Sequence, residues 1–257
     1  MTIEAVEQCL AEFRYGALTA PAGGRLLYRL VLESDAESVL ELGFAHGTST
    51  MYMAAALQER GSGSIMTLDR TSALTRRPNI HELSAALSLE GYVTPVLAER
   101  SYNWELKKLL EQQWEGSRTV PCFDMCFVDG AHSWYEDGLA FVLVDKLLRD
   151  DSWIVFDDVR WTYASSPTLD AEKLESYPEE ERDAAQVMAI FDLLVRQHPA
   201  YDGFRVLGNY AAAHKVGREG HDGNRDAFDR ALTPDVVHEL AFGPLGDPRR
   251  EHLAPRA

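Results

Sequence analysis

Short apolar runs alternate with stretches of helical periodicity over the first 160 residues. Runs of strand length occur at residues 38–42, 64–68, 93–97, 123–128 and 153–156. Between them, apolar residues recur at helical spacing within residues 48–60, 80–90, 104–114 and 136–149. Strands that are apolar throughout are typical of a sheet buried on both faces, and strand–helix alternation produces parallel βαβ units. The pattern therefore predicts an α/β fold, a Rossmann-like doubly wound sheet.

The two ends of the chain depart from this alternation. Residues 1–33 are predicted to form an N-terminal helical segment, with a turn at residues 21–24. The main domain is predicted to span residues 34–216. Within it, residues 161–185 form a long, polar insertion on the substrate side, a helix follows near residues 187–195, and a hairpin of strands closes the domain at residues 204–216. Residues 217–257 are predicted to be a weakly ordered C-terminal tail with a short helix near residues 234–240.

The composition is that of an ordinary globular protein. The chain has 257 residues, of which 46% are hydrophobic, which is enough for one large domain. Its 41 acidic and 25 basic residues give a net charge of −16, which argues against nucleic acid or an anionic membrane as a partner. Three cysteines offer no disulfide framework, and neither a signal peptide nor a membrane-length apolar run is present, so we expect a cytoplasmic protein.

Three aspartates follow two of the apolar runs. Asp129 ends one predicted strand, and Asp157 with Asp158 ends the next. Ligands bind outside the carboxyl ends of strands in open α/β sheets, and clustered carboxylates are unfavourable unless a cation neutralises them. Oxygen ligands of this kind are those that Mg²⁺ prefers. The three aspartates therefore predict a metal site, although capping and loop hydrogen bonding are the alternative role of acids at strand ends.

A glycine-containing loop follows the first predicted strand, from Glu41 through Gly43 to Gly47. Glycine there lets the backbone turn and approach a ligand, but the G-x-G-x-x-G fingerprint of dinucleotide binding is absent. The anionic Glu41 would repel a pyrophosphate and attract an ammonium group. Asp69 ends the next strand, where a carboxylate can accept both hydroxyls of a ribose. Together these residues favour a cationic adenosine compound without phosphate.

These residues, together with the segments Val128-Asp129-Gly130-Ala131-His132 and Phe156-Asp157-Asp158, resemble class I S-adenosylmethionine-dependent methyltransferases. The sequence is most similar to the metal-dependent O-methyltransferases of natural-product biosynthesis, which include macrolide-sugar and cephalosporin-tailoring enzymes. The resemblance covers roughly residues 38–216. It implies a sheet of order 3-2-1-4-5-7-6 with the last strand antiparallel.

The resemblance also assigns roles to individual residues. It implies that S-adenosylmethionine is bound by Glu41, Gly43, Gly47, Thr48, Ser49, Asp69, Arg70, Glu99, Ser101 and Asp129. It implies that Mg²⁺ is bound by Asp129, Asp157 and Asp158. A bound Mg²⁺ would hold the acceptor hydroxyl and make it more acidic, while a neutral imidazole on His132 could take its proton. Asp129 and His132 are therefore the predicted catalytic residues, although His132 could instead bind cofactor, water or backbone.

The resulting prediction is an O-methyltransferase that uses S-adenosylmethionine and Mg²⁺ on a hydroxyl of a small molecule, for which a natural-product intermediate is plausible. A metal-independent N-, C- or carboxyl-methyltransferase of the same fold is the nearest alternative. An NAD-dependent oxidoreductase and a non-catalytic cofactor-binding protein are alternatives of other classes. Trp134, Trp161 and Tyr163 could line the acceptor pocket or only pack the insertion onto the domain. The acceptor is not specified by the sequence, and a homo-oligomer remains open.

Overall fold

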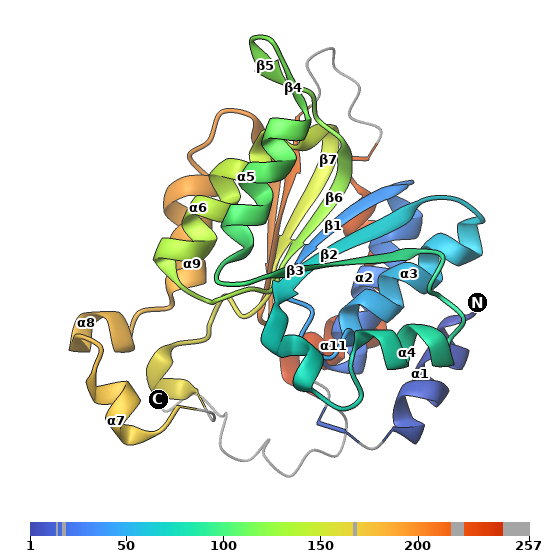
Figure 1. The fold of residues 1–257 in the computed structure, drawn as a ribbon, viewed down its shortest axis with the longest axis horizontal. Coiled ribbons are helices and arrows are strands. Elements are labelled where there is room, and N and C mark those ends of the chain that lie inside the picture. The colour runs from blue at the N-terminus through green and yellow to red at the C-terminus, as the bar shows by residue number, and fades with distance from the viewer. Residues whose placement is uncertain (14, 17–18, 167–168, 217–223, 244–257) are drawn as a thin grey trace.

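A seven-stranded sheet forms the centre of the protein (Figure 1). The computed structural model describes residues 1–13, 15–16, 19–166, 169–216 and 224–243. The strands of the sheet are β1 (Ser38–Leu42), β2 (Ser64–Arg70), β3 (Val93–Ala98), β6 (Phe123–Val128), β7 (Leu148–Phe156), β8 (Tyr201–Leu207) and β9 (Tyr210–Lys215). Two further strands, β4 (Trp114–Glu115) and β5 (Arg118–Thr119), form a separate hairpin.

The strand order in the sheet is β3-β2-β1-β6-β7-β9-β8. The pairs from β3 to β7 are parallel, whereas β9 is antiparallel to both of its neighbours. When the strands of this sheet are numbered consecutively along the chain, the order becomes 3-2-1-4-5-7-6 with the last strand antiparallel. The structure therefore confirms the predicted fold and topology.

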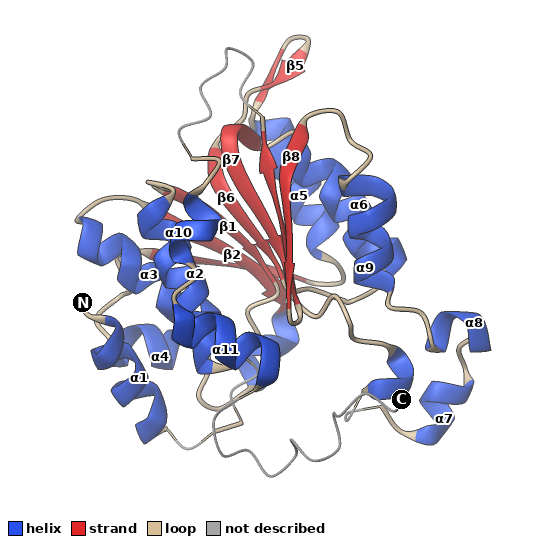
Figure 2. Ribbon diagram, turned by 180° about the vertical axis from the view of Figure 1, so that it is seen from behind, coloured by secondary structure: helices blue, strands red, loops and turns tan. Residues whose placement is uncertain are grey.

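Helices cover both faces of the sheet (Figure 2). One face packs against α1 (Ile3–Glu12), α2 (Pro21–Glu33), α3 (Thr48–Arg60) and α4 (Ile80–Ala86), together with α10 (Ala227–Ala231) and α11 (Pro234–Phe242). The other face packs against α5 (Tyr102–Gln112), α6 (Trp134–Asp145), α9 (Gln186–Ile190) and the π-helical turn η3 (Phe191–Val195). Both faces of the central strands are thus buried, which is why β1, β6 and the second half of β7 are mainly apolar.

The predicted turn at residues 21–24 is wrong, because these residues begin helix α2. Pro21 occupies the first helical turn, where its missing N–H removes no intrahelical bond. Gly23 and Gly24 are not turn residues here. A Cβ built on Gly23 would lie 2.0 Å from the hydroxyl oxygen of Tyr210, and one built on Gly24 would lie 2.3 Å from the ring of Tyr52. These glycines therefore allow two aromatic side chains to approach the helix backbone.

Several helix boundaries also differ from the predictions, because side-chain caps set them. The predicted helix at 80–90 ends at Ala86, and Asn79 with Glu82 forms a capping box at its start. The predicted helix at 104–114 begins at Tyr102 and ends at Gln112, and its cap is Ser101, whose side chain accepts a hydrogen bond from the backbone N–H of Asn103. The predicted helix at 136–149 begins at Trp134 and ends at Asp145.

The prediction of a weakly ordered tail from residue 217 is wrong for residues 224–243. These residues contain α10 and α11, which pack on α2 with Phe228 and Val236 fully buried. The guanidinium of Arg25 forms an ion pair with Glu239 of α11. The short helix predicted near 234–240 is confirmed, whereas the rest of the predicted tail lies outside the described residues.

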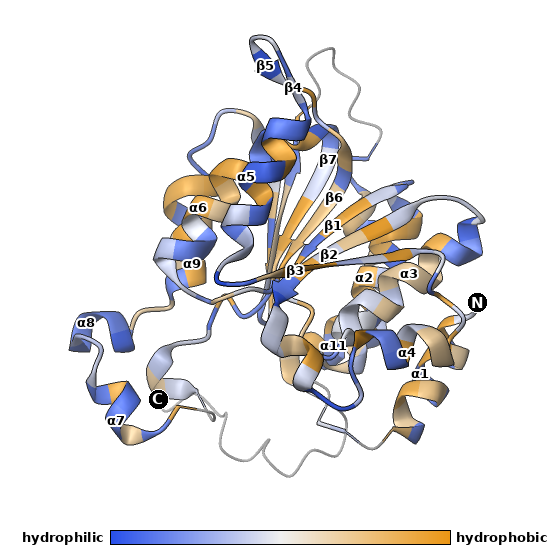
Figure 3. Ribbon diagram, viewed as in Figure 1, coloured by the Kyte–Doolittle hydropathy of each residue, from blue (hydrophilic) through white to orange (hydrophobic). Residues whose placement is uncertain are grey.

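The insertion is partly helical, with η2 (Tyr163–Ser165), α7 (Ala171–Glu175) and α8 (Glu179–Arg182). It extends away from the sheet, and α7 and α8 are mainly hydrophilic, in contrast to the strands (Figure 3). A further turn, η1 (Thr71–Thr75), follows β2. Among the described residues, no helix combines the length and the hydropathy needed to cross a membrane.

Candidate functional site

A cavity of about 1370 Å³ lies at the carboxyl ends of the strands. This is the edge at which open α/β sheets bind their ligands. Most of the predicted site residues line it, namely Gly43, Asp69, Arg70, Ser101, Asp129, His132, Asp157 and Asp158. Five predicted cofactor residues do not line it, namely Glu41, Gly47, Thr48, Ser49 and Glu99.

Asp69 holds the glycine-containing loop in place. One carboxylate oxygen accepts hydrogen bonds from the backbone N–H groups of Phe44, at 3.0 Å, and Ala45, at 2.7 Å. The other oxygen accepts one from the N–H of Arg70 at 2.6 Å. A carboxylate can accept about four hydrogen bonds, so the side chain of Asp69, which lines the cavity, retains about one acceptor site.

Ala45 takes the place of a glycine at a position that favours glycine. Its φ is 51°, in the left-handed region, where a Cβ costs roughly 1–2 kcal/mol. The hydrogen bond from its N–H to Asp69 helps to hold this conformation. The loop therefore keeps the turn without the dinucleotide fingerprint.

Glu41, a predicted cofactor residue, is fully buried in the structure. Its carboxylate accepts hydrogen bonds from the hydroxyls of Ser49 at 2.6 Å, Thr50 at 2.5 Å and Thr67 at 2.5 Å. Burial raises the pKa of Glu41 to about 7, although the three hydroxyls act in the opposite direction. Glu41 therefore ties β1, β2 and α3 together below the cavity.

Four other predicted cofactor residues do not line the cavity. Three of them lie at the start of α3, and the fourth, Glu99, is exposed. Gly47 precedes α3 as its N-cap, with a φ of 100°. The Thr48 hydroxyl lies 2.7 Å from the hydroxyl of Tyr15, while the Ser49 hydroxyl is used by Glu41. Glu99 is exposed, and its neighbour Arg100 lines the cavity instead.

Asp129, His132 and Asp158 converge on one point of the cavity. One ligand atom from each lies within 4.8 Å of the other two. The Nε2 atom of His132 is 3.3 Å from Oδ1 of Asp129 and 3.6 Å from Oδ2 of Asp158. Asp129 and Asp158 come from adjacent parallel strands, β6 and β7, so the sheet itself brings them together.

Two residues of this cluster have strained backbones. His132 has a φ of 54° and Asp158 has a φ of 52°, both in the left-handed region. Consecutive residues of a regular strand point to opposite faces, so Asp157 and Asp158 could not both face this edge if β7 continued. Because β7 ends at Phe156 and the chain turns at Asp158, both aspartates line the cavity.

Asp157 lies beneath the cluster and is almost fully buried. Its Oδ1 accepts a hydrogen bond from the N–H of Asp158 at 2.7 Å, and its carboxylate is hydrogen-bonded by the hydroxyl of Tyr210. Burial, followed by the charges of Asp129 and Asp158, raises the pKa of Asp157 well above its ordinary value. Asp129 and Asp158 disfavour the charge of Asp157, and carboxylates gathered in this way form a donor set that a divalent cation fits.

The pKa of His132 is raised to about 9. Burial lowers it, but the hydrogen bond and charge of Asp129 and the charge of Asp158 outweigh burial. This agrees with the direction expected from the neighbouring carboxylates. A cation held by these carboxylates would act in the opposite direction and favour the neutral imidazole.

Aromatic rings form one wall of the cavity beside this cluster. The ring of Trp161 lies 5.1 Å from that of His132 and 5.1 Å from that of Tyr163. Tyr163 in turn stacks on Tyr177 at 4.2 Å. Trp161 and Tyr163 thus line the cavity, which was one of the two predicted roles, whereas Trp134 does not.

Sequence reasoning missed several residues of the cavity. Tyr177 extends the aromatic wall from the insertion, and Leu240 and Phe242 at the end of α11 line the cavity as well. Tyr210 and Asn209 reach it from the β8–β9 hairpin. No motif marks these residues, because they belong to segments that only the folded chain brings to the ends of β6 and β7.

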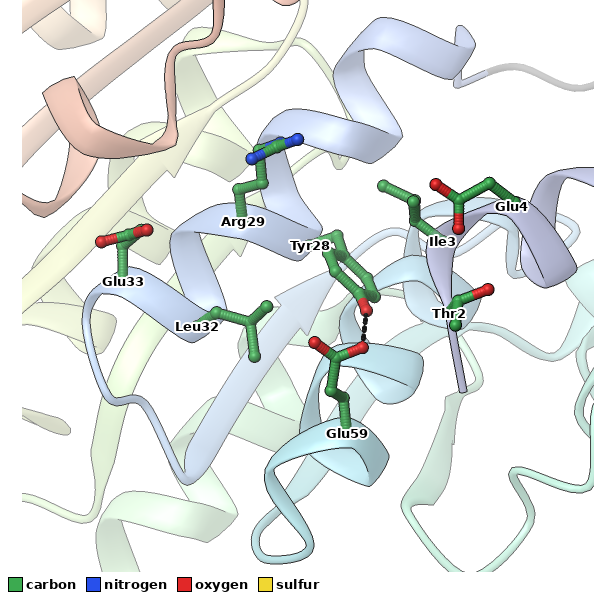
Figure 4. Close-up of a pocket in the computed structure, with 8 residues that line it drawn as sticks. All are labelled: Thr2, Ile3, Glu4, Tyr28, Arg29, Leu32, Glu33 and Glu59. Atoms are coloured by element: carbon green, nitrogen blue, oxygen red, sulfur yellow. Dashed lines mark hydrogen bonds between the residues drawn. The ribbon is translucent and has the colours of Figure 1, made fainter.

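A second, smaller hollow of about 270 Å³ lies between the N-terminal segment, α2 and α3 (Figure 4). Two of its carboxylates already have partners in the structure. Glu59 accepts a hydrogen bond from Tyr28, and Glu33 pairs with Arg230 at 2.9 Å. This hollow contains none of the predicted site residues.

Comparison with known proteins identifies the type of domain. Residues 40–159, from β1 to just beyond Asp158, match a family described as a methyltransferase domain. No curated protein matches the sequence significantly.

Solved methyltransferase structures share the fold. An O-methyltransferase from Bacillus cereus in complex with S-adenosylhomocysteine is 20% identical, with a TM-score of 0.57 over 83% of this chain and 90% of that one. TomG from Streptomyces achromogenes, an O-methyltransferase of tomaymycin synthesis in complex with S-adenosylmethionine, is 21% identical, with a TM-score of 0.54 over 84% and 89%. The S-adenosylhomocysteine-bound methyltransferase PaMTH1 from Podospora anserina is 17% identical, with a TM-score of 0.58 over 84% and 87%.

At these identities the structural likeness establishes the fold alone, and the family match is to a methyltransferase domain over residues 40–159. The family match over residues 40–159 agrees with the predicted class of enzyme, a methyltransferase. The matched domain contains both the glycine-containing loop and the three aspartates.

Proposed function

We propose that this methyltransferase transfers the methyl group of S-adenosylmethionine to a hydroxyl of a small-molecule acceptor, with Mg²⁺ held at Asp129, Asp157 and Asp158. The observation that carries the proposal is the convergence of Asp129, His132 and Asp158 within 4.8 Å, in the cavity that also contains Asp69 and the glycine-containing loop. A candidate cofactor site and a candidate cation site therefore share one cavity.

The cofactor end of the cavity suits an adenosine compound. Asp69 lines the cavity, its carboxylate has about one acceptor site left, and it would hold a ribose hydroxyl. The backbone at Gly43 would lie against the methionine part. Arg70, Arg100 and Ser101 lie on the remaining side, where the adenine would lie. S-adenosylmethionine and S-adenosylhomocysteine occupy TomG and the Bacillus cereus enzyme, which supports this assignment.

The other end of the cavity suits a hydroxyl acceptor. When bound there, Mg²⁺ would supply Lewis acidity that lowers the pKa of the acceptor hydroxyl. The aromatic wall of Trp161, Tyr163 and Tyr177 would exclude water and orient the acceptor. Leu240 and Phe242 provide apolar surface from α11. A natural-product acceptor is compatible with these walls, and TomG acts in the synthesis of such a compound.

Methyl transfer is a displacement at carbon. The acceptor oxygen forms a bond to the methyl carbon while the bond from that carbon to sulfur breaks, which leaves S-adenosylhomocysteine. The reacting atoms need alignment and close approach, which a rigid sheet edge can provide. The acceptor proton would pass to Nε2 of His132, and Asp129 would stabilise the resulting imidazolium at 3.3 Å.

The proposal is tested by removal of divalent cations. We expect EDTA treatment to abolish methyl transfer to vicinal dihydroxy acceptors, Mg²⁺ to restore it, and Asp158→Asn to reduce it at least 100-fold while S-adenosylhomocysteine still binds. A matched control is Asp124→Asn. Asp124 also lies on β6, but its carboxylate accepts hydrogen bonds from the backbone N–H groups of Glu37 and Ser38 and does not line the cavity. Full activity without divalent cations would instead support a metal-independent methyltransferase of the same fold. A cytoplasmic location remains the sequence-based prediction.

A further inference from the structure

Tyr210 is the one residue of the last strand whose side chain reaches the buried aspartate of the candidate metal site. It is the first residue of β9, its side chain is almost fully buried, and it lines the cavity. Its hydroxyl hydrogen-bonds with the carboxylate of Asp157. The pairing of Phe156 with Ala211 in the antiparallel sheet places Tyr210 beside Asp157.

Asp157 is in turn linked to Asp158. Its Oδ1 accepts the N–H of Asp158 at 2.7 Å, so the Asp157 carboxylate has two donors, one from a backbone and one from Tyr210. The backbone of Asp158 is held in the left-handed region, which is unfavourable for a residue with a Cβ. A donor that fixes the Asp157 carboxylate therefore also fixes the turn that presents Asp158.

The β8–β9 turn next to Tyr210 contacts the same segment. The N–H of Val159 donates to the carbonyl of Asn209 at 3.0 Å. The side-chain amide of Asn209 donates to Oδ1 of Asp158 at 3.2 Å. Tyr210 thus belongs to a set of contacts by which the antiparallel hairpin holds the end of β7.

Helix α2 fixes the position of the Tyr210 hydroxyl from the other side. A Cβ on Gly23 would lie 2.0 Å from the hydroxyl oxygen and 2.8 Å from the ring carbon that carries it. The absence of a side chain at Gly23 thus leaves room for the Tyr210 hydroxyl. The backbone of α2 lies against this hydroxyl and limits its movement away from Asp157. The N-terminal segment, outside the matched methyltransferase domain, thereby supports the site.

We propose that Tyr210 is a positioning residue of the metal site, which orients Asp157 and, through it, the turn that presents Asp158 to the cation. The proposal rests on the proposed function, since it requires the cation site at the three aspartates. It assigns Tyr210 no contact with the reacting atoms. Hydrogen-bond partners of metal-binding residues typically change metal affinity by about 10–100-fold when removed.

The test is Mn²⁺ binding to the purified protein, followed by electron paramagnetic resonance, with S-adenosylhomocysteine binding measured by calorimetry. Tyr210→Phe removes only the hydroxyl. We expect it to weaken Mn²⁺ binding at least 10-fold and to leave the Kd of S-adenosylhomocysteine within about twofold of the wild type.

Tyr201→Phe is the matched control. Tyr201 is equally buried, lies on the neighbouring strand β8, and donates to an aspartate, Asp145, at 3.0 Å. It lies away from the cavity, so we expect its loss to leave Mn²⁺ affinity unchanged. If buried tyrosine hydroxyls only stabilised the fold, the two substitutions would change Mn²⁺ affinity to the same extent.

Three outcomes would overturn the proposal. The first is a Tyr210→Phe protein whose Mn²⁺ affinity stays within twofold of the wild type, which leaves the proposed function intact. The second is a Tyr210→Phe protein that loses S-adenosylhomocysteine binding as well, which would make the hydroxyl a general structural contact. The third is a wild-type protein that binds S-adenosylhomocysteine but no Mn²⁺, which overturns the metal role in the proposed function too.

Discussion

Gly43 lies directly against the backbone carbonyl of Asp129. A Cβ built on Gly43 would be 1.9 Å from that oxygen, closer than any real side chain allows. The contact joins the loop after β1 to the end of the neighbouring strand β6. Because the proposed cofactor and cation sites meet here, the distance between them depends on the absence of a side chain at residue 43.

Gly43→Ala should therefore damage both the fold and the cofactor site. The substitution places a Cβ at a φ of 85° and against backbone that cannot move aside. We expect a loss of about 2–4 kcal/mol in the free energy of unfolding and a weaker affinity for S-adenosylhomocysteine. Denaturant unfolding and calorimetry measure the two effects.

Gly61→Ala is the control for the cost of placing a Cβ at a positive φ without a steric contact. Gly61 ends α3 with a φ of 80°, but a Cβ there would meet nothing within 4 Å. Its substitution should cost only about 1 kcal/mol and should leave S-adenosylhomocysteine binding unchanged. Equal losses in the two variants would show that the contact with Asp129 contributes nothing.

Asp69→Ala should weaken cofactor binding more than Asp69→Asn. Alanine leaves the N–H groups of Phe44 and Ala45 without their acceptor and removes the proposed ribose ligand. Each unpaired buried donor costs roughly 1–3 kcal/mol, so we expect the Kd of S-adenosylhomocysteine to rise about 10–100-fold. Asparagine keeps one acceptor oxygen for the loop and should have a smaller effect. Unchanged calorimetric binding by Asp69→Ala would refute the role.

His132→Gln should reduce kcat about 10²–10⁴-fold, because glutamine cannot accept the acceptor proton. The Kd of S-adenosylhomocysteine should stay unchanged, since the imidazole contacts Asp129 and Asp158 rather than the proposed cofactor residues. His81→Gln, at an exposed position on α4, is the control. A reduction in kcat of less than tenfold would exclude His132 as the general base.

Glu41→Gln should change how stability depends on pH. The pKa of Glu41 is raised to about 7 from an ordinary value of 4.5, so the folded protein binds the proton more tightly than the unfolded chain. The stability from this group is fully present below about pH 4.5 and is lost as the pH rises through about 7. At 1.36 kcal/mol per pKa unit, the loss is about 3 kcal/mol.

The glutamine variant has no carboxyl to titrate, so its unfolding free energy should fall less between pH 5 and pH 8. The exposed Glu115→Gln variant should retain the wild-type slope. Denaturant unfolding at several pH values measures these slopes. Parallel curves for wild type and Glu41→Gln would show that Glu41 does not titrate in this range.

Much of the fold could be predicted from the sequence, because both faces of the sheet are buried. The apolar runs around Leu40, Cys126 and Ile154 are strands for that reason, and their parallel order follows from the helices between them. Helix ends were less predictable, since a cap such as Ser101 depends on single hydrogen bonds. The segment at Gly23 was misread as a turn because glycine also permits close packing between a helix and an aromatic ring.

The site residues that could be predicted from the sequence are the acidic residues at the carboxyl ends of strands. Asp69, Asp129 and Asp158 all end strands, and parallel strands bring their carboxyl ends to one edge. The surroundings of Glu41 could not be predicted in this way. It also lies near the end of a strand, but its side chain points to the inner face, where Ser49, Thr50 and Thr67 take its hydrogen bonds.

The amino-acid sequence alone determined the strands, their parallel βαβ arrangement and the acids at their ends, because periodicity and strand ends are local properties of the chain. The order of the strands came from the resemblance to a known family. Only the tertiary structure decided what surrounds those acids. Tyr210 meets Asp157, and Phe242 reaches the cavity, through contacts between residues distant in the sequence. Such contacts depend on how whole elements pack, and no local pattern of residues records them.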